Sequence, residues 1–387
     1  MSALLSSVRT HKVNFWNYID WPLISSAFLL SILGLITMFS FSAENAYFDH
    51  QVVWLALSVV VFIFASLLDY RFLRQTWPVA TLYAIVLVAL VAVFIFGTVV
   101  KGAQSRFDVG LFAIQPADFA MLALIIVLAK YFARRHIDIA QFRHIVISGV
   151  YAFIPFMLIV LQPDLGSGII LASIWLGMVL VSGISKKHLL VVALIALTAG
   201  GGMWVYGLHE YQKQRVLTFL NPLADIQGAG YNAYQSVIAV GSGGLTGRGI
   251  GYGTQSKLRF LPENQTDFIF AAYAEEWGLI GVLLLFGLYT IVIWRIFSLS
   301  LRGGSNFETL FAVGVACLFM AHFIVHVGIN LGLLPVTGTT TPFMSYGGSH
   351  LIVEYLALGM LMGMRRYARI ARPDQVREEF TPTVVVR

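Results

Sequence analysis

Charge and cysteine are what this sequence has least of. Only 11% of its 387 residues are Asp, Glu, Lys or Arg, while 58% are hydrophobic, and the mean hydropathy is +0.80. Soluble domains carry about 25% charged residues, so this composition excludes a water-soluble globule. The single cysteine, Cys317, excludes an internal disulfide and a cysteine-based metal cluster. Because it lies in a hydrophobic stretch, we interpret it as a small packing residue.

The first residues also lack the pattern of a cleavable leader. The first residues, MSALLSSVRTHKVNFWNYID, contain no short apolar core that ends in a small-residue cleavage site. The first long apolar run begins only near residue 22, so we interpret it as a membrane span that is retained.

Long apolar runs fill most of the remaining chain. A helix of about 20 apolar residues can cross a bilayer, so the runs predict an all-α, polytopic integral membrane protein with about ten transmembrane helices. The predicted helices lie near residues 22–41, 51–68, 78–98, 116–131, 145–161, 166–183, 188–207, 268–294, 307–331 and 349–364. We expect one membrane domain over residues 1–372 and a short cytoplasmic tail over residues 373–387.

The basic residues predict the orientation of these helices. The formal net charge is +6, and Lys and Arg are enriched in the cytoplasmic segments of membrane proteins. With the N-terminus inside, only seven of the 25 basic residues fall outside, namely Lys101, Arg106, Lys213, Arg215, Arg248, Lys257 and Arg259. Both termini are therefore expected in the cytoplasm, and the basic charge reflects membrane topology rather than binding of nucleic acid.

Five of those seven residues lie in the segment 208–267, between the predicted seventh and eighth helices. This outer loop is too long for an ordinary connection, which is typical of a functional or a mobile segment. Glycines recur between residues 241 and 253, where they let the backbone approach a ligand closely, and Arg248 lies among them. The spacing matches neither a Walker loop nor a dinucleotide-binding fingerprint, so a flexible loop and an anion-binding loop both remain open.

Asp267 is the best candidate for a general base. It lies where the loop meets the apolar run FIFAAYA, and burial near lipid raises the pKa of a carboxyl group toward the range of a base. It could instead serve only as the N-cap of the next helix. Glu275 and Glu276 follow about two helical turns later, so we expect them deeper in the membrane, with one of them lining an inner polar site.

Three other outer segments contribute polar side chains. Arg106, Gln115 and Asp118 precede or open the fourth helix, and Asp164 lies in the tight turn QPDLG between the fifth and sixth helices. Asp164 is equally well explained as a helix cap. In the last outer loop, LLPVTGTTTPFMSYGGSH at residues 333–350, hydroxyl groups precede a Gly-Gly pair, where the backbone can approach a sugar or a diphosphate.

Two residue pairs on the last two helices have helical spacing. His322 and His326 could bind a metal, but the sequence offers neither the glutamate of a zincin motif nor a third ligand, so we interpret them as packed polar residues. Gly359 and Gly363 form a small-xxx-small pair, which predicts close packing of the last helix against a neighbour.

Six motifs occur along the chain in a fixed order. They are QPDLGSG at 162–168, the run from Gly230 through QSVIAVGSGGLTGRG, FLPENQTDFIFA at 260–271, AEEWG at 274–278, LLPVTG, and SYGGS at 345–349. Together they resemble the SEDS family (shape, elongation, division and sporulation), and most closely its RodA branch. The resemblance extends across nearly all ten predicted helices.

The resemblance implies a SEDS-type bundle and a peptidoglycan glycosyltransferase that polymerises lipid II at the outer membrane face during cell elongation, with a class B penicillin-binding protein as its partner. The family's essential aspartate lies in the TDF motif, which is Asp267 here, where it would act as the general base. Cationic side chains would stabilise the leaving diphosphate. The residues expected to bind substrate are Arg106, Gln115, Asp118, Asp164, Arg215, Gln235, Ser242, Arg248, Glu263, Glu276, Ser345 and Tyr346.

No dedicated cofactor or resident metal is expected; a Mg or Mn ion would arrive with the substrate diphosphate. The chain also departs from the family pattern. Relatives commonly have QPSE followed by a lysine, whereas this chain has QPAD, ending at Asp118, and then Met121. Phe107 stands where a tryptophan is usual, and GTTTP replaces a more apolar GVPLP. Because Met121 cannot supply a cation, either a neighbouring base compensates or the contribution of this position is absent.

Three other functions remain open on the sequence. A transporter of lipid-linked precursor would also use an ionisable residue inside the membrane, such as Glu275 or Glu276. Loss of the usual lysine would suit an inactive scaffold. A division-type polymerase would carry the same motifs, although the short cytoplasmic ends favour the elongation type.

Overall fold

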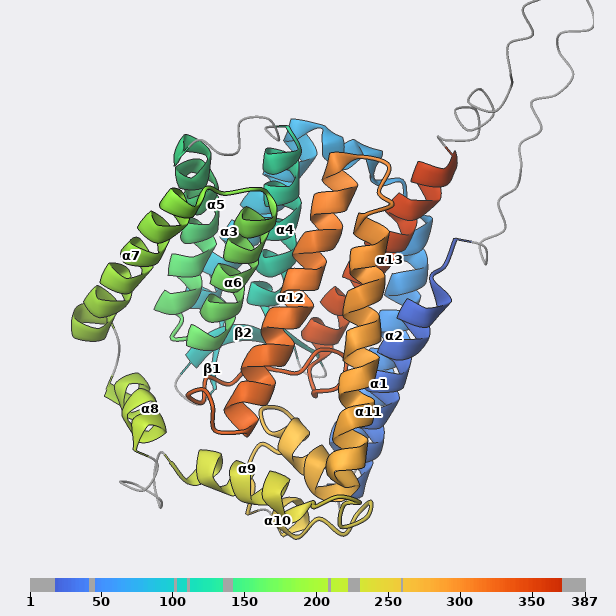
Figure 1. Ribbon diagram of the computed structural model, residues 1–387, viewed down its shortest axis with the longest axis vertical. Coiled ribbons are helices and arrows are strands. Elements are labelled where there is room, and N and C mark those ends of the chain that lie inside the picture. Colours follow the sequence, from blue (N-terminus) through green and yellow to red (C-terminus); the bar gives the residue numbers. More distant parts are fainter. Residues whose placement is uncertain are drawn as a thin grey trace, which may run out of the picture.

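The computed structural model describes residues 18–41, 46–100, 103–109, 112–134, 142–207, 210–221, 230–258 and 260–370. Long helices run roughly side by side, and the short elements α8 to α10, β1 and β2 gather toward one end of them (Figure 1). The long helices are α1 (Trp21–Phe41), α2 (Ala46–Leu67), α3 (Thr76–Phe96), α4 (Pro116–Ala133), α5 (Phe142–Leu161), α6 (Leu165–Val181), α7 (Lys186–Gly202), α11 (Ile269–Ser300), α12 (Asn306–Asn330) and α13 (Gly348–Ile370). The predicted tail, Lys101 and Arg259 lie outside the described residues.

Each of the ten predicted segments is helical, with shifted boundaries. Eight of the helices in the described chain are long and apolar enough to cross a membrane, so the chain is a multi-pass membrane protein. The remaining two are α6, which has only 17 residues, and α13, whose last turns carry Arg365 and Arg366. That all ten helices cross the membrane stays a prediction.

Short elements occupy two connections that the sequence analysis treated as loops. Strands β1 (Thr98–Val100), β2 (Ala103–Val109) and β3 (Phe112–Ile114) form an antiparallel ribbon before α4. The segment 208–267 contains the helices α8 (Glu210–Leu220), α9 (Tyr231–Ser242) and α10 (Thr254–Lys257). The all-α prediction therefore missed a small sheet, and much of the segment predicted as one long outer loop is folded. The remaining short elements are the turns η2 (Tyr70–Arg74) and η3 (Met203–Gly207).

Helix α11 is a hairpin of two limbs. Gly278 has φ 64° and ψ −165°, a backbone conformation that interrupts the helix. The rings of Phe270 and Phe286 stack with their centroids 6.1 Å apart. Sixteen residues of straight helix would separate them by about 24 Å, so the short limb (269–277) folds back on the long limb (279–300). The prediction of one continuous span over this region is therefore wrong.

This reversal inverts the expected depth of the acidic residues. Tyr273 Oη donates to the carbonyl of Gly281 at 3.0 Å, which joins the two limbs beside the turn. Since the short limb runs antiparallel to the long limb, Asp267 lies farther along the bundle than Glu275 and Glu276, which lie next to the turn. The expectation that the two glutamates lie deeper than Asp267 is wrong, because hydropathy does not reveal a change of direction.

Helices α4 and α12 form the centre of the bundle. In their most apolar stretches, 78% of α4 and 72% of α12 are buried, compared with 6% for α7. Helix α7 lies at the edge of the molecule (Figure 1). Cys317 of α12 lies against Gly177 of α6, as expected for a small packing residue. Gly359 and Gly363 of α13 approach α2 and the residues after it so closely that a side chain at either position would meet backbone atoms, which confirms the predicted close packing.

Candidate active site

Asp267 is a half-buried residue directly before the short limb of α11. The N-cap of α11 is Phe268 and has no side-chain cap, so the interpretation of Asp267 as the N-cap is wrong. Buried Asn330, at the end of α12, donates from Nδ2 to the Asp267 carbonyl at 3.0 Å. Its Oδ1 accepts from the Ala271 N–H, also at 3.0 Å. One amide side chain thus fixes the backbone on both sides of the short limb's first turn.

The last outer loop holds Asp267 from the other side. Ser345 Oγ donates to the Thr266 carbonyl at 2.9 Å, and the Tyr346 N–H donates at the same distance to the carbonyl two residues before Asp267. Gly338 has φ 73°, and a Cβ added there would lie 3.5 Å from Asp267 Oδ2. The Asp267 carboxylate therefore lies against glycine backbone, within a loop rich in hydroxyl groups.

Gln115, Asp118 and Asp164 meet although they come from separate segments. Gln115 Nε2 donates to Asp164 Oδ2 at 3.0 Å. Ser349 Oγ accepts from the Gln115 N–H at 3.2 Å and donates to Asp118 Oδ2 at 2.8 Å. Asp164 Oδ1 also accepts from the Ser167 N–H at 3.0 Å, so its capping role is confirmed. Burial raises the pKa of Asp164, against the hydrogen bonds from Ser167, which lower it, and with the charge of Asp118, which raises it further.

His350 connects Asp118 to α13. Its Nδ1 lies 3.4 Å from Asp118 Oδ1, and its Nε2 lies 2.8 Å from Glu354 Oε1. All three side chains are buried, as is Met121. The other oxygen of Glu354 accepts from the Phe343 N–H at 2.8 Å, inside the last outer loop. A base therefore does lie beside Asp118, at a position that the sequence analysis did not consider.

Arg106 of the strand ribbon acts electrostatically on Tyr346 of the same loop. The ring of Tyr346 packs edge-on against Tyr47 with centroids 4.9 Å apart. Burial raises the pKa of Tyr346, and the positive charge of Arg106 acts in the opposite direction. Arg106 is thus near enough to act electrostatically on the loop that contacts Asp267.

The glycine-rich turn, residues 241–253, packs against the hairpin turn of α11, away from Asp267. The Arg248 N–H donates to the Glu275 carbonyl at 2.9 Å, and Arg248 Nε donates to the Ser242 carbonyl at 2.9 Å. Glu276 Oε1 accepts from the backbone N–H of residue 251 at 2.7 Å. About 12 Å of helix separates Glu275 from Asp267, so this cluster is distinct from the polar groups around Asp267.

Glu275 anchors α10 rather than facing an open polar site. Its carboxylate accepts from the N–H groups of Gln255 at 2.8 Å and Ser256 at 3.1 Å, and from the Ser256 hydroxyl at 2.8 Å. The side chains of Glu275 and Glu276 are both buried. Through these contacts the two glutamates hold residues 251–256 against α11. The substrate-binding role of Glu276 stays a prediction.

Comparison with known proteins identifies the family to which this chain belongs. A family model for cell cycle proteins of the FtsW, RodA and SpoVE type matches residues 20–370. The chain belongs to this family.

Relatives of the family match along nearly the whole chain. Peptidoglycan glycosyltransferase MrdB of Escherichia coli K12 is 34% identical over 363 residues, which cover 93% of this chain and 97% of that protein. Stage V sporulation protein E of Bacillus subtilis is 34% identical over 360 residues, covering 90% and 98%.

Solved structures agree with these matches. A chain from a peptidoglycan synthase complex, described as coordinating polymerization and crosslinking, aligns with a TM-score of 0.79 and 31% identity, covering 91% of this chain and 98% of that one. The rod shape determining protein RodA of Thermus thermophilus aligns with a TM-score of 0.68 and 28% identity, with the same coverage. The RodA-like prediction of family and fold is therefore confirmed.

In this FtsW/RodA/SpoVE family member, the remaining predicted residues are spread over several elements. Arg215 of α8 donates from Nη1 to a carbonyl of the last outer loop at 3.4 Å. Gln235 and Ser242 lie on α9. Glu263 has φ 54°, and its Oε2 accepts from the Thr266 hydroxyl at 3.1 Å. Their roles toward substrate stay predictions.

The two histidines of α12 also belong to the loop's framework in this family member. His326 Nδ1 donates to the Thr339 carbonyl at 2.8 Å, and His322 Nδ1 to the Thr340 carbonyl at 3.3 Å. Their interpretation as packed polar residues is therefore confirmed. The described segments contain no group of three His, Cys, Asp or Glu side chains that could hold a metal ion.

Sequence reasoning missed four buried polar residues that build this site. They are Gln51, Asn330, His350 and Glu354. Gln51 Nε2, for example, donates to the Ser345 carbonyl at 3.1 Å and so supports the loop beside Asp267. The available signal was a polar or ionisable residue within an apolar helix, which is costly unless it has a partner.

Proposed function

We infer that this chain is a peptidoglycan glycosyltransferase that polymerises lipid II. The observation that carries the inference is Asp267, whose backbone is held by Asn330 on one side, while Ser345 of the last outer loop binds the carbonyl of the preceding residue. It supports the inference because the same chain is 34% identical, over 93% of its length, to a relative named peptidoglycan glycosyltransferase.

Asp267 acts as the general base in this proposal. A sugar hydroxyl is a weak nucleophile at neutral pH, and a carboxylate beside it can accept its proton in the transition state. The hydroxyl oxygen then forms a bond to the anomeric carbon of the donor sugar. The bond from that carbon to the diphosphate breaks, the lipid diphosphate leaves, and a single displacement inverts the anomeric configuration.

Cations near the last outer loop are suited to the leaving group. Preorganised positive charge stabilises negative charge that develops on the departing diphosphate oxygen. Arg215 donates to a carbonyl of that loop and Arg106 acts electrostatically on its Tyr346, whereas Arg248 lies at the turn of the α11 hairpin. We therefore assign the first two to the diphosphate. A Mg or Mn ion, when used, accompanies the substrate diphosphate.

The proposed setting is the outer face of the bacterial cytoplasmic membrane, with both termini in the cytoplasm. The excess of Lys and Arg at the other end of the bundle supports this orientation. A class B penicillin-binding protein is the proposed partner, because the similar chain of known structure belongs to a complex that coordinates polymerization and crosslinking. Cell elongation, rather than division, is the proposed process.

The test is glycan synthesis by the purified full-length chain, alone and with a candidate class B partner, from labelled lipid II. A general base contributes about 10²- to 10⁴-fold, so Asp267→Asn should lower the rate at least about 100-fold. Asp49→Asn is the matched control, because Asp49 is an exposed carboxylate in the first turn of α2, outside the candidate site.

Retention of polymer synthesis by Asp267→Asn would exclude the proposed role of that carboxylate. No polymer from the native chain with its partner, combined with movement of lipid II across liposome membranes, would instead identify a transporter.

A further inference from the structure

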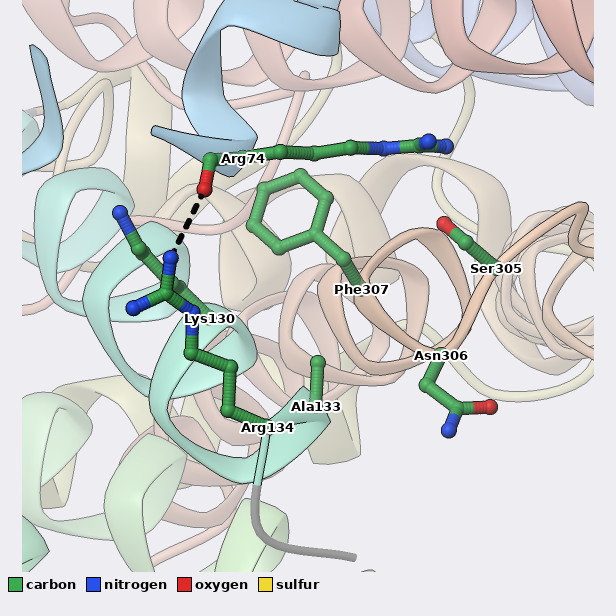
Figure 2. A pocket seen from close by; sticks show the side chains of 7 residues that line it. All are labelled: Arg74, Lys130, Ala133, Arg134, Ser305, Asn306 and Phe307. Carbon is green, nitrogen blue, oxygen red and sulfur yellow. Dashed lines mark hydrogen bonds between the residues drawn. The ribbon is translucent and has the colours of Figure 1, made fainter. Parts of the chain in front are cut away.

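A cavity lies at the end of the bundle opposite the candidate active site. It has a volume of about 280 Å³, just below the usual range for small-ligand pockets, and is formed where α4 ends, α12 begins and η2 leads into α3. Figure 2 shows the residues that line it, which are Arg74, Lys130, Ala133, Arg134, Ser305, Asn306 and Phe307. Three of the seven are cationic.

Among the described residues, the charges around this cavity do not balance. Arg74 pairs with Glu308 at 3.0 Å, and the second oxygen of Glu308 accepts from the Gly304 N–H. For Lys130 and Arg134, the described part of the chain offers no carboxylate within ion-pair distance. Their acceptors are neutral: Lys130 Nζ donates to a backbone carbonyl in the turn before α3, and Arg134 donates to the Arg74 carbonyl at 3.1 Å.

Burial of Lys130 carries a desolvation cost that no carboxylate of the described residues offsets. It is only 8% exposed, and a buried ammonium group with neutral acceptors alone lacks the counter-charge that normally offsets its lost hydration. Lysines that serve only to orient a membrane protein have no need for burial, since they act from solvent-exposed loops. An anion in the cavity would supply the missing counter-charge.

The N-terminus of α12 opens into the same cavity. Ser305 Oγ accepts from the Glu308 N–H at 3.4 Å, and within the described chain no acceptor is recorded for the N–H groups of Asn306 and Phe307. Such open amide groups, at the positive end of a helix dipole, bind phosphate oxygens well. Figure 2 shows the Phe307 ring beside the hydrogen bond that joins Arg134 to the Arg74 carbonyl, with Asn306 on the opposite side of the ring from Arg134.

We propose that this cavity binds a phosphate group, held by Lys130 and Arg134 beside the N-terminal end of α12. The nonpolar side chains of Ala133 and Phe307 form the wall against which the carbon atoms of a phosphodiester would lie. The phosphate can belong to an anionic lipid of the adjacent leaflet or to a soluble phosphate compound. This site is separate from the glycosyltransferase reaction, so its test does not depend on catalysis.

The experiment uses the full-length chain in a neutral detergent. Native mass spectrometry measures retention of phosphatidylglycerol against phosphatidylcholine with the same acyl chains, and thermal unfolding measures stabilisation by inorganic phosphate. Each charge-assisted hydrogen bond is worth enough that Lys130→Met or Arg134→Gln should weaken phosphate-group binding about tenfold. Lys187→Gln is the control, because this exposed cation lies at the start of α7, outside the cavity.

Selective retention of phosphatidylglycerol that is lost in the two cavity variants identifies a lipid headgroup as the ligand. Stabilisation by inorganic phosphate that is lost in the same variants, and that displaces the lipid, identifies a soluble phosphate compound. Equal binding by native and cavity variants, or an equal loss in Lys187→Gln, overturns the proposal. Should Lys130→Met elute as aggregate, Arg134→Gln decides the outcome, because its side chain is exposed.

Discussion

His350 occupies an unusual place in the bundle, between two buried carboxylates. Its ring nitrogens lie 3.4 Å from Asp118 Oδ1 and 2.8 Å from Glu354 Oε1, and the ring centroid is 4.7 Å from that of His322. Asp118 in turn bonds Ser349, which bonds the Gln115 backbone. A single imidazole therefore joins α4, α13 and the loop beside the candidate base.

Replacement of His350 should be costly. Removing one partner from a buried charged group destabilises a protein by about 3–5 kcal/mol, because the other group stays buried without compensation. We expect His350→Ala to lower the free energy of unfolding in detergent by about 3 kcal/mol, and glycan synthesis to fall with it. His50→Ala is the matched control, since His50 is exposed and should change stability by no more than about 0.5 kcal/mol.

Equal stability of the two alanine variants would show that His350 adds nothing to the pairing. Met121→Lys would restore the lysine that is usual in the family, but it should destabilise this chain. Met121 is 1% exposed within the main hydrophobic core, so a lysine there would bury a further charge.

At the scale of single elements, the α11 hairpin decides where Asp267 lies. The turn depends on Gly278, whose φ of 64° and ψ of −165° are accessible to almost no other residue. A Cβ at this position would also meet the backbone of Leu245 and Gly247 in the glycine-rich turn. The turn and the hairpin therefore pack as one unit.

Replacing either of two glycines of α11 by alanine should change the stability of the protein, but in opposite directions. Gly278→Ala combines backbone strain of about 1–3 kcal/mol with a steric clash, so it should lower the melting temperature and the rate of glycan synthesis. Gly287→Ala places a Cβ where no atom lies within 4 Å and should stabilise the helix by about 0.5–1 kcal/mol. Thermal unfolding in detergent measures both, and a Gly278→Ala variant as stable as Gly287→Ala would contradict the hairpin.

At the scale of the whole molecule, Asp20 joins three segments at the basic end of the bundle. Arg295 of α11 donates from Nη2 to Asp20 Oδ2 at 2.6 Å, and Arg365 of α13 donates to the same oxygen at 3.0 Å. The Asp20 side chain is fully buried. Residues almost a whole chain length apart are thus fixed around one carboxylate, directly before α1.

Asp20→Asn should destabilise the bundle by about 3–5 kcal/mol, because two partly buried guanidinium groups would lose their shared counter-charge. The control is Asp69→Asn, which removes an exposed pair with Arg71 at 2.6 Å and should cost at most about 1 kcal/mol. The midpoint of chemical denaturation in detergent distinguishes the two. Similar midpoints for both variants would mean that the Asp20 cluster is no more than a surface pair.

The sequence alone was sufficient for the membrane class, the positions of most long helices and Asp267 as the candidate base. These features are local: a helix must satisfy its own backbone hydrogen bonds in lipid, so apolar length by itself reports a span. The family motifs around Asp267 are contiguous as well, and could be read directly from the sequence.

Tertiary structure alone decided the direction of the chain at Gly278, the assembly of Gln115, Asp118 and Asp164 around Ser349, and the place of His350 beside Asp118. Each depends on contacts between segments far apart in the sequence, and hydropathy carries no information about which polar groups will face one another. Tertiary structure also decided the cavity around Lys130, because its cationic side chains come together only once α4, α12 and η2 pack against one another.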